Sequence, residues 1–239
     1  GYWSSVEAAD LDGDGRVDLV LGNLGLNTKY VANEAANYEL YFSADPAASP
    51  RLFIDAVRTG GKAYPMETRT LHQMYLPDEM ARTGTYEEFG DMTVEEAFGP
   101  EVMARLDRRS LKEARSLVAF QREGGRFELI ELPHAAQAGR MIDVLAADLD
   151  EDGDADLVAI VESLAPQPWV ALRPNQGFLV ALLNDGGGRF EALLPAASGL
   201  SVPEGQPKRL AFADLDGDGR GELLVSASDG PLYVFRLGE

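Results

Sequence analysis

Acidic residues recur at a fixed spacing in three short segments of the sequence, a pattern that can bind a metal ion. The segments are AADLDGDGRVDLVLGN at 8–23, AADLDEDGDADLVAIV at 146–161 and FADLDGDGRGELLVSA at 212–227. Each contains a loop with acids at its positions 1, 3, 5 and 9. Carboxylates this close together repel one another unless a cation neutralises them. Asp-Gly pairs are common in ordinary turns, but three copies of one acidic spacing favour a metal-binding loop.

The spacing suits a hard divalent cation, above all Ca²⁺. Ca²⁺ takes six to eight oxygen ligands, whereas Mg²⁺ prefers a smaller octahedral shell that keeps several waters. We predict up to three calcium ions, each bound by four acidic side chains and by the backbone carbonyl of loop position 7. The predicted ligands are Asp10, Asp12, Asp14, Arg16 and Asp18 in the first loop; Asp148, Asp150, Asp152, Asp154 and Asp156 in the second; and Asp214, Asp216, Asp218, Arg220 and Glu222 in the third.

Two departures from the common pattern distinguish the loops. Glu151 stands at position 4 of the second loop, where the other two loops have glycine. Glu222 stands at position 9 of the third loop, where the other two have aspartate. We expect the third site to be the weakest of the three.

An EF-hand begins with a similar acidic loop, and the sequence separates the two. An EF-hand needs a bidentate glutamate at position 12 and a helix after the loop. Position 12 is Leu21, Ala159 or Val225 here, and each loop runs into apolar residues typical of a strand. We therefore predict that each loop joins two strands and that the acid at position 9 completes the ligand shell.

A repeated unit of short β-prone runs surrounds each loop, which predicts an antiparallel all-β fold. The loops start 138 and 66 residues apart, so the first interval has room for a second unit. We assign that unit to 40–57, a strand, turn and strand with only Asp45 in the turn and no expected metal. Residues 66–116 have helical periodicity, with Thr93 and Glu96 spaced as a capping box. We expect an α-helical insertion there, either as a cover for the sheets or as a partner-binding element.

The acidic loops resemble those of FG-GAP/VCBS repeat proteins, which read D-x-D-x-D-G-x-x-D, as in the propellers of integrin α-subunits. Segments 1–30, 60–66, the expected helical insertion, 129–140 and 182–200 are also similar to bacterial VCBS-repeat proteins near the ASPIC/UnbV group. The resemblance implies a β-propeller, with calcium loops at one face of the ring. We expect 1–239 to form a single propeller or partial propeller region of about four antiparallel blades. We further expect it to be part of a longer chain, or to assemble with further blades or subunits.

Charge and composition limit the classes of binding partner and of metal site that we expect. The chain has 40 acidic and 21 basic residues and a net charge of −19, so it repels phosphate backbones and nucleic acid is not an expected partner. It has no cysteine, which excludes disulfides and thiolate metal sites. It has no apolar run long enough to span a membrane. Free Ca²⁺ is plentiful outside cells, so we expect a secreted, periplasmic or cell-surface protein.

The sequence offers little that indicates catalysis. Its two histidines, His72 and His134, lie in a helical stretch and after a proline, and no nucleophile elbow, zincin motif or P-loop is found. We expect no enzyme activity but a calcium-binding interaction module, for example in cell adhesion, with a protein or glycan partner. Two alternatives stay open. One is a carbohydrate- or polymer-binding module attached to a glycan-active hydrolase or lyase, and the other is a structural subunit of an envelope assembly.

Overall fold

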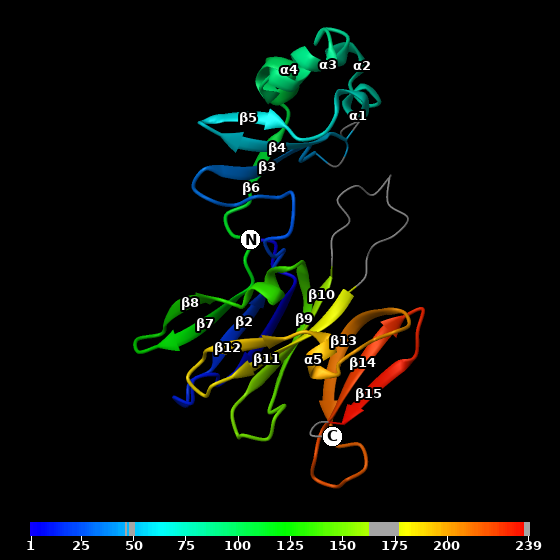
Figure 1. The fold of residues 1–239 in the computed structure, drawn as a ribbon. Coiled ribbons are helices and arrows are strands. Elements are labelled where there is room, and N and C mark those ends of the chain that lie inside the picture. The colour runs from blue at the N-terminus through cyan, green and yellow to red at the C-terminus, as the bar shows by residue number, and fades with distance from the viewer. Residues whose placement is uncertain (46, 48–50, 163–176, 237–239) are drawn as a thin grey trace. The chain divides into compact units, whose positions relative to one another are not determined.

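The computed structural model describes residues 1–45, 47, 51–162 and 177–236 (Figure 1). The chain forms two compact units. The acidic-loop unit comprises Gly1–Lys29 and Ala114–Glu239, and the inserted unit comprises Tyr30–Glu113. None of the helices in the described part of the chain has the length and apolar character needed to cross a bilayer.

The described part of the acidic-loop unit consists of three antiparallel sheets. Within each sheet, strands that follow one another in this unit are also hydrogen-bonded neighbours. The first sheet contains β1 (Ser5–Ala9), β2 (Asp18–Gly22), β7 (Leu117–Arg122) and β8 (Arg126–Glu131). The second contains β9 (Arg140–Ala147), β10 (Asp156–Glu162), β11 (Gly177–Asn184) and β12 (Phe190–Leu193). The third contains β13 (Gln206–Ala213), β14 (Glu222–Ser228) and β15 (Leu232–Arg236). Short helical segments, η1 (His134–Gln137) and α5 (Pro195–Ser198), join sheets or follow them.

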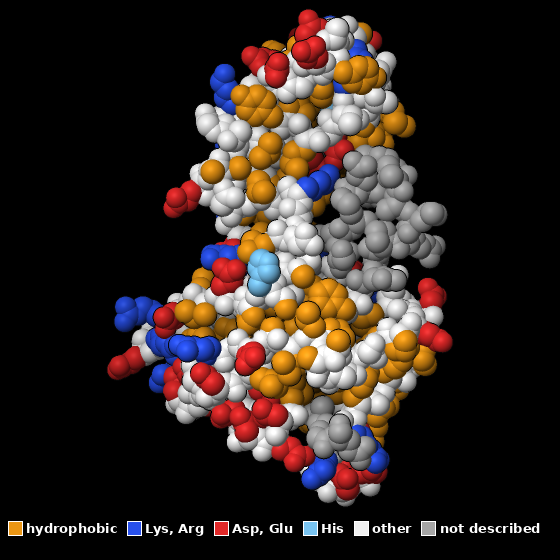
Figure 2. All heavy atoms as spheres, in the orientation of Figure 1, with side chains coloured by type: hydrophobic (Ala, Val, Ile, Leu, Met, Phe, Trp, Pro, Cys, Tyr) orange, Lys and Arg blue, Asp and Glu red, His pale blue; other side chains and the backbone are white. Residues whose placement is uncertain are grey.

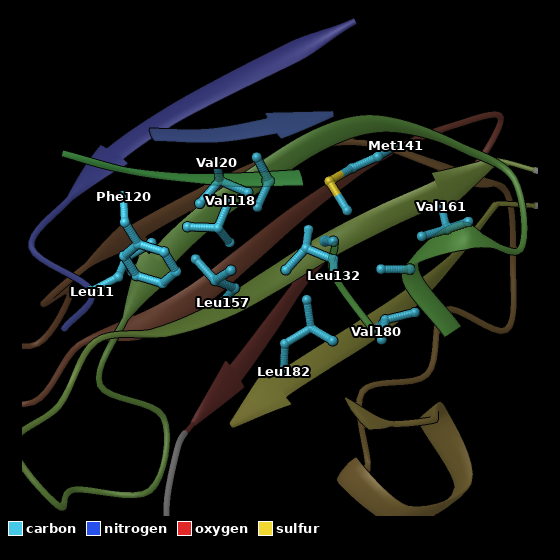
Figure 3. Packing of buried hydrophobic residues seen from close by; sticks show 13 residues of the cluster. Leu11, Val20, Val118, Phe120, Leu132, Met141, Leu157, Val161, Val180 and Leu182 are labelled. Atoms are coloured by element: carbon cyan, nitrogen blue, oxygen red, sulfur yellow. The ribbon is translucent and has the colours of Figure 1, made fainter. Parts of the chain in front are cut away.

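The three sheets pack face to face in series, as the blades of a propeller do. The first strands lie together, with β1 and β13 each beside β9. Figure 3 shows one interface, where Val20, Val118 and Phe120 of the first sheet meet Leu157 and Val180 of the second. The other face of the second sheet packs on the third through residues such as Ile160 and Val225. β10 is therefore covered on both faces, which explains why its sequence is an almost continuous apolar run.

The inserted unit has its own sheet and its own helices. Its strands are β3 (Ala36–Phe42), β4 (Phe53–Thr59), β5 (Lys62–Pro65) and β6 (Asp107–Ser110), paired in the order β5-β4-β3-β6. Its helices are α1 (Arg69–Gln73), α2 (Pro77–Met80), α3 (Tyr86–Asp91) and α4 (Val94–Met103). Helix and strand residues share one core, in which Ile54, Met80 and Phe98 are buried. The predicted capping box is confirmed, because the Glu96 N–H donates to Thr93 and the Thr93 N–H donates to Glu96.

The prediction of an all-β fold of partial propeller type is confirmed for the described residues, which form four antiparallel sheets, three in the acidic-loop unit and one in the inserted unit. The expected strand, turn and strand near 40–57 corresponds to the pair β3 and β4. The helices of the inserted unit lie between Arg69 and Met103.

The wide interval between the first two acidic loops has a simpler origin than a repeat that lost its acids. The whole inserted unit lies between β2 and β7, which are hydrogen-bonded neighbours in one sheet.

Candidate metal centres

Each acidic loop connects the first two strands of a sheet in the acidic-loop unit. The loops run from β1 to β2, from β9 to β10 and from β13 to β14, and in Figure 1 they lie at the lower end of this unit. Figure 2 shows Asp and Glu side chains gathered over the same end. The acid at position 9 is the first residue of the second strand, opposite an alanine of the first. The prediction that these loops join strands, unlike EF-hand loops, is confirmed.

Backbone N–H groups hold the acid at position 1 in place. In the first loop, Asp10 accepts hydrogen bonds from the N–H of Asp14 at 3.2 Å and from that of Gly15 at 2.8 Å. The second loop repeats both bonds, from Asp152 at 3.2 Å and Gly153 at 3.0 Å to Asp148. In the third loop, Asp214 accepts from Gly217 at 2.6 Å and from Gly219 at 3.0 Å. These hydrogen bonds curl the loop backbone around its first carboxylate without any covalent cross-link.

The loops also need a left-handed backbone conformation at position 4. Gly13 and Gly217 adopt it with φ of 70° and 79°. Glu151 adopts it as well, with φ of 63°, although side chains other than glycine rarely do so. The second loop therefore keeps the shape of the others at some cost in backbone strain.

The acids at position 9 are buried, and they clamp each loop to the rest of its sheet. Asp18 and Asp156 have no exposed surface. One oxygen of Asp156 accepts from the N–H of Leu149 at 2.8 Å, and the other accepts from the N–H of Asn184 at 2.7 Å. Asp18 makes the matching bonds with Leu11 at 3.0 Å and Gln121 at 2.7 Å. Gln121 belongs to β7 and Asn184 to β11, the third strands of their sheets. The hydrogen bonds of each of these two acids therefore link a loop to a strand that is distant in the sequence.

The second loop shows most clearly how burial and neighbouring carboxylates affect the acid at position 9. Burial raises the pKa of Asp156, and the nearby carboxylates of Asp150 and Asp152 raise it further, against the N–H donors of Asn184 and Leu149. The ionised form of this acid is therefore disfavoured unless positive charge comes close. A bound cation would supply that charge.

Three carboxylates in each loop approach one another closely enough to share one ion. In each group, one oxygen per residue lies within 4.8 Å of the others. Among the described residues, the groups are Asp10, Asp12 and Asp18; Asp148, Asp150 and Asp156; and Asp214, Asp216 and Asp218.

The groups do not contain every predicted ligand. Asp14 is ion-paired with Arg16 in the first loop, and Asp152 is not part of the second group. In the third loop, Glu222 accepts from the N–H of Leu215 at 2.9 Å and lies 3.6 Å from Arg236. The roles of these three acids, and of the carbonyls of Arg16, Asp154 and Arg220, as ligands stay predictions.

The donor set fits a hard cation. Every side-chain oxygen in the three groups belongs to a carboxylate, the ligand type that Ca²⁺ prefers. In the first loop, Oδ1 of Asp12 is buried and has no hydrogen-bond partner among the described residues. A buried carboxylate oxygen without a partner is costly, and a cation in the group would satisfy it.

Sequence reasoning missed the residues that the third strand brings to the loops. Arg122 of β7 forms an ion pair with Asp12, and Gln121 and Asn184 provide the N–H groups of the two clamps. A weak signal was present, since both third strands are apolar runs that turn polar at their last residues. Nothing in the sequence tells which loop such a residue would reach.

The comparison with protein families agrees with the geometry of the first loop. Residues 2–35 match the FG-GAP repeat, a repeat that often binds calcium and mediates interactions between proteins. The second and third loops lie outside the matched residues. The predicted similarity to VCBS-repeat proteins near the ASPIC/UnbV group stays a prediction. The comparison with curated proteins found no match.

Proposed function

From the FG-GAP match over residues 2–35 and the recurrence of its loop geometry in two further sheets, we propose that this chain is a calcium-binding interaction module. The observation that carries the proposal is the grouping of three carboxylates in each of three loops, with the unpartnered Oδ1 of Asp12 in one group. The grouped residues would hold the ion, and its charge would offset the repulsion between them.

The proposed role of the ion is to stabilise the connections within the sheets. A ligand that binds the folded state but not the unfolded state adds about 2.7 kcal/mol to stability when its concentration is a hundred times its dissociation constant. In a chain without cysteine, this contribution takes the place that disulfides occupy in many exported domains.

Calcium titration of the whole chain tests the proposal. We expect isothermal calorimetry to detect calcium binding, and the melting temperature to rise with calcium and fall with chelator. The variant Asp150→Asn should remove one binding event. The matched control Asp107→Asn makes the same charge change at an exposed residue of β6 and should leave binding unaltered. Superimposable melting curves with calcium and with chelator would refute calcium binding.

We further propose that the chain acts outside the cytoplasm, as a secreted, periplasmic or cell-surface module. FG-GAP repeats are typically extracellular, and calcium there is concentrated enough to fill modest sites. The proposed partner is a protein or a glycan. Glycan arrays probed with and without calcium separate the two classes, because only a glycan partner gives calcium-dependent spots.

We propose binding rather than catalysis as the activity. His72 is buried in the inserted unit, and its ring centroid lies 4.8 Å from that of Phe98. Burial also lowers the pKa of His72, against the nearby charges of Glu67 and Asp55. A neutral imidazole packed on an aromatic ring suits a core role better than proton transfer. Hydrolysis of polysaccharide by the purified chain would overturn this proposal.

A further inference from the structure

Arg122, the last residue of β7, reaches the first acidic loop across a separation of 110 residues. Its Nη1 donates a hydrogen bond to Oδ2 of Asp12 and lies 3.8 Å from a carboxylate oxygen of Asp14. The other oxygen of Asp12, Oδ1, is the buried atom that has no hydrogen-bond partner among the described residues. Arg122 therefore holds one oxygen of Asp12 and leaves the other uncommitted.

Two further contacts fix the guanidinium itself. Its Nε donates to Oε2 of Glu128, on the neighbouring strand β8, at 2.9 Å. Its Cζ lies 4.9 Å from the centre of the Phe120 ring, and Phe120 is part of the buried core. Because Glu128 and Phe120 already restrict the Arg122 side chain, the guanidinium loses little further conformational freedom when it orients Asp12.

The second loop has no arginine at the matching place. Gln121 and Asn184 are equivalent, because the N–H of each donates to the acid at position 9 of its loop. The residue after Asn184 is Asp185, which accepts from the N–H groups of Gly187 at 3.0 Å and Arg189 at 3.2 Å. In the third loop, Arg236, the last residue of β15, donates to Oδ2 of Asp216 at 2.8 Å. The contact between an arginine at the end of the third strand and the acid at position 3 therefore occurs in the first and third loops and not in the second.

We propose that Arg122 is a positioning residue of the first calcium site, which orients the Asp12 carboxylate so that Oδ1 is presented to the cation. The inference rests on the proposed calcium binding. Removal of Arg122 has two opposite effects, since the hydrogen bond orients a ligand while the positive charge repels a cation. The proposal requires that orientation outweighs repulsion. Groups that hold metal ligands in place typically contribute about 10- to 100-fold to metal affinity.

The test uses the full chain with Asp150→Asn and Asp216→Asn, which leaves the first site to be titrated with calcium chloride by calorimetry. We expect Arg122→Ala to weaken calcium binding by about tenfold or more. Arg122→Lys keeps the charge and a hydrogen-bond donor group but not the planar fork of the guanidinium, so it should recover part of the loss. The control Arg115→Ala removes an arginine that precedes β7 and pairs with Glu131 of β8 at 3.4 Å, and it should leave calcium affinity unchanged.

Melting curves in chelator distinguish positioning from a general structural role. Equal or tighter calcium binding by Arg122→Ala overturns the proposal, as does a lower melting temperature in chelator with unchanged affinity. The same variants are made in the otherwise natural chain, where calcium-dependent hydrogen exchange of the Asp14 and Gly15 amides reports on the first loop alone. If the natural chain binds no calcium, the proposed function is wrong. If it binds and Arg122→Ala binds equally well, only the role of Arg122 is wrong.

Discussion

At the scale of single residues, the acids of one loop divide into two kinds. Asp156 is fully buried, and both its oxygens accept backbone N–H groups. Asp150 lies in the same carboxylate group but is exposed. We expect the first acid to support the fold with or without an ion, and the second to serve mainly the proposed ion.

The two kinds should separate on mutation. We expect Asp156→Ala to lower the free energy of unfolding by about 2–5 kcal/mol even in chelator, because it leaves the N–H groups of Leu149 and Asn184 without acceptors. Asp150→Asn should cost little in chelator and reduce only the stabilisation by calcium. Urea denaturation of both variants, with calcium and with chelator, measures the difference. A similar loss in chelator for both would contradict the division.

At the scale of elements, an ion pair joins two neighbouring sheets of the acidic-loop unit. Glu162 of β10 is buried and accepts hydrogen bonds from Arg140 of β9 and from Lys208 of β13, the latter at 2.9 Å. Burial favours the protonated form of Glu162, but the hydrogen bonds and charges of Lys208 and Arg140 dominate and lower its pKa below 4.5.

This lowered pKa predicts how stability depends on pH. The folded state binds fewer protons at Glu162 than the unfolded state, so the contribution is present above pH 4.5 and is lost as the pH falls through the lower folded value. We expect Glu162→Gln to cost about 1–2 kcal/mol near pH 7, because it removes charge-assisted hydrogen bonds to Lys208 and Arg140, and the partial exposure of these two partners to solvent keeps the cost modest. The cost should shrink below pH 4.5. A constant difference between the two proteins from pH 7 to pH 3 in chelator would contradict this.

The elements also show what the sequence could predict. The loops and their flanking strands follow from local patterns, as Leu19–Leu21 after Asp18 illustrates, and the structure contains them as expected. The pairing of β2 with β7 could not be predicted, because β7 carries no mark that assigns it to a strand on the other side of the inserted unit. Arg122 was missed for the same reason. Its partner is set by that pairing and not by spacing in the sequence.

At the scale of the whole molecule, the chain is divided into a unit with all three carboxylate groups and a unit with none among its described residues. We therefore expect calcium to slow hydrogen exchange in the sheets of the acidic-loop unit and to leave β3 to β6 unchanged. Mass spectrometry of peptides from both units, with calcium and with chelator, measures this. Equal protection of Tyr30–Glu113 would show that the inserted unit depends on the ion as well.

The position of the inserted unit, between β2 and β7, has a consequence for biosynthesis. A ribosome makes the chain from its amino terminus, so β1, β2 and the first acidic loop emerge well before the strand that completes their sheet. Until residues 30–113 have been translated, Asp18 lacks the amide of Gln121, and the apolar side chain of Val20 lacks its neighbour Val118. The inserted unit is a compact body with its own buried core, so we expect it to fold during this delay. The hairpin of β1 and β2 thus waits for the whole inserted unit to be translated before its sheet can be completed.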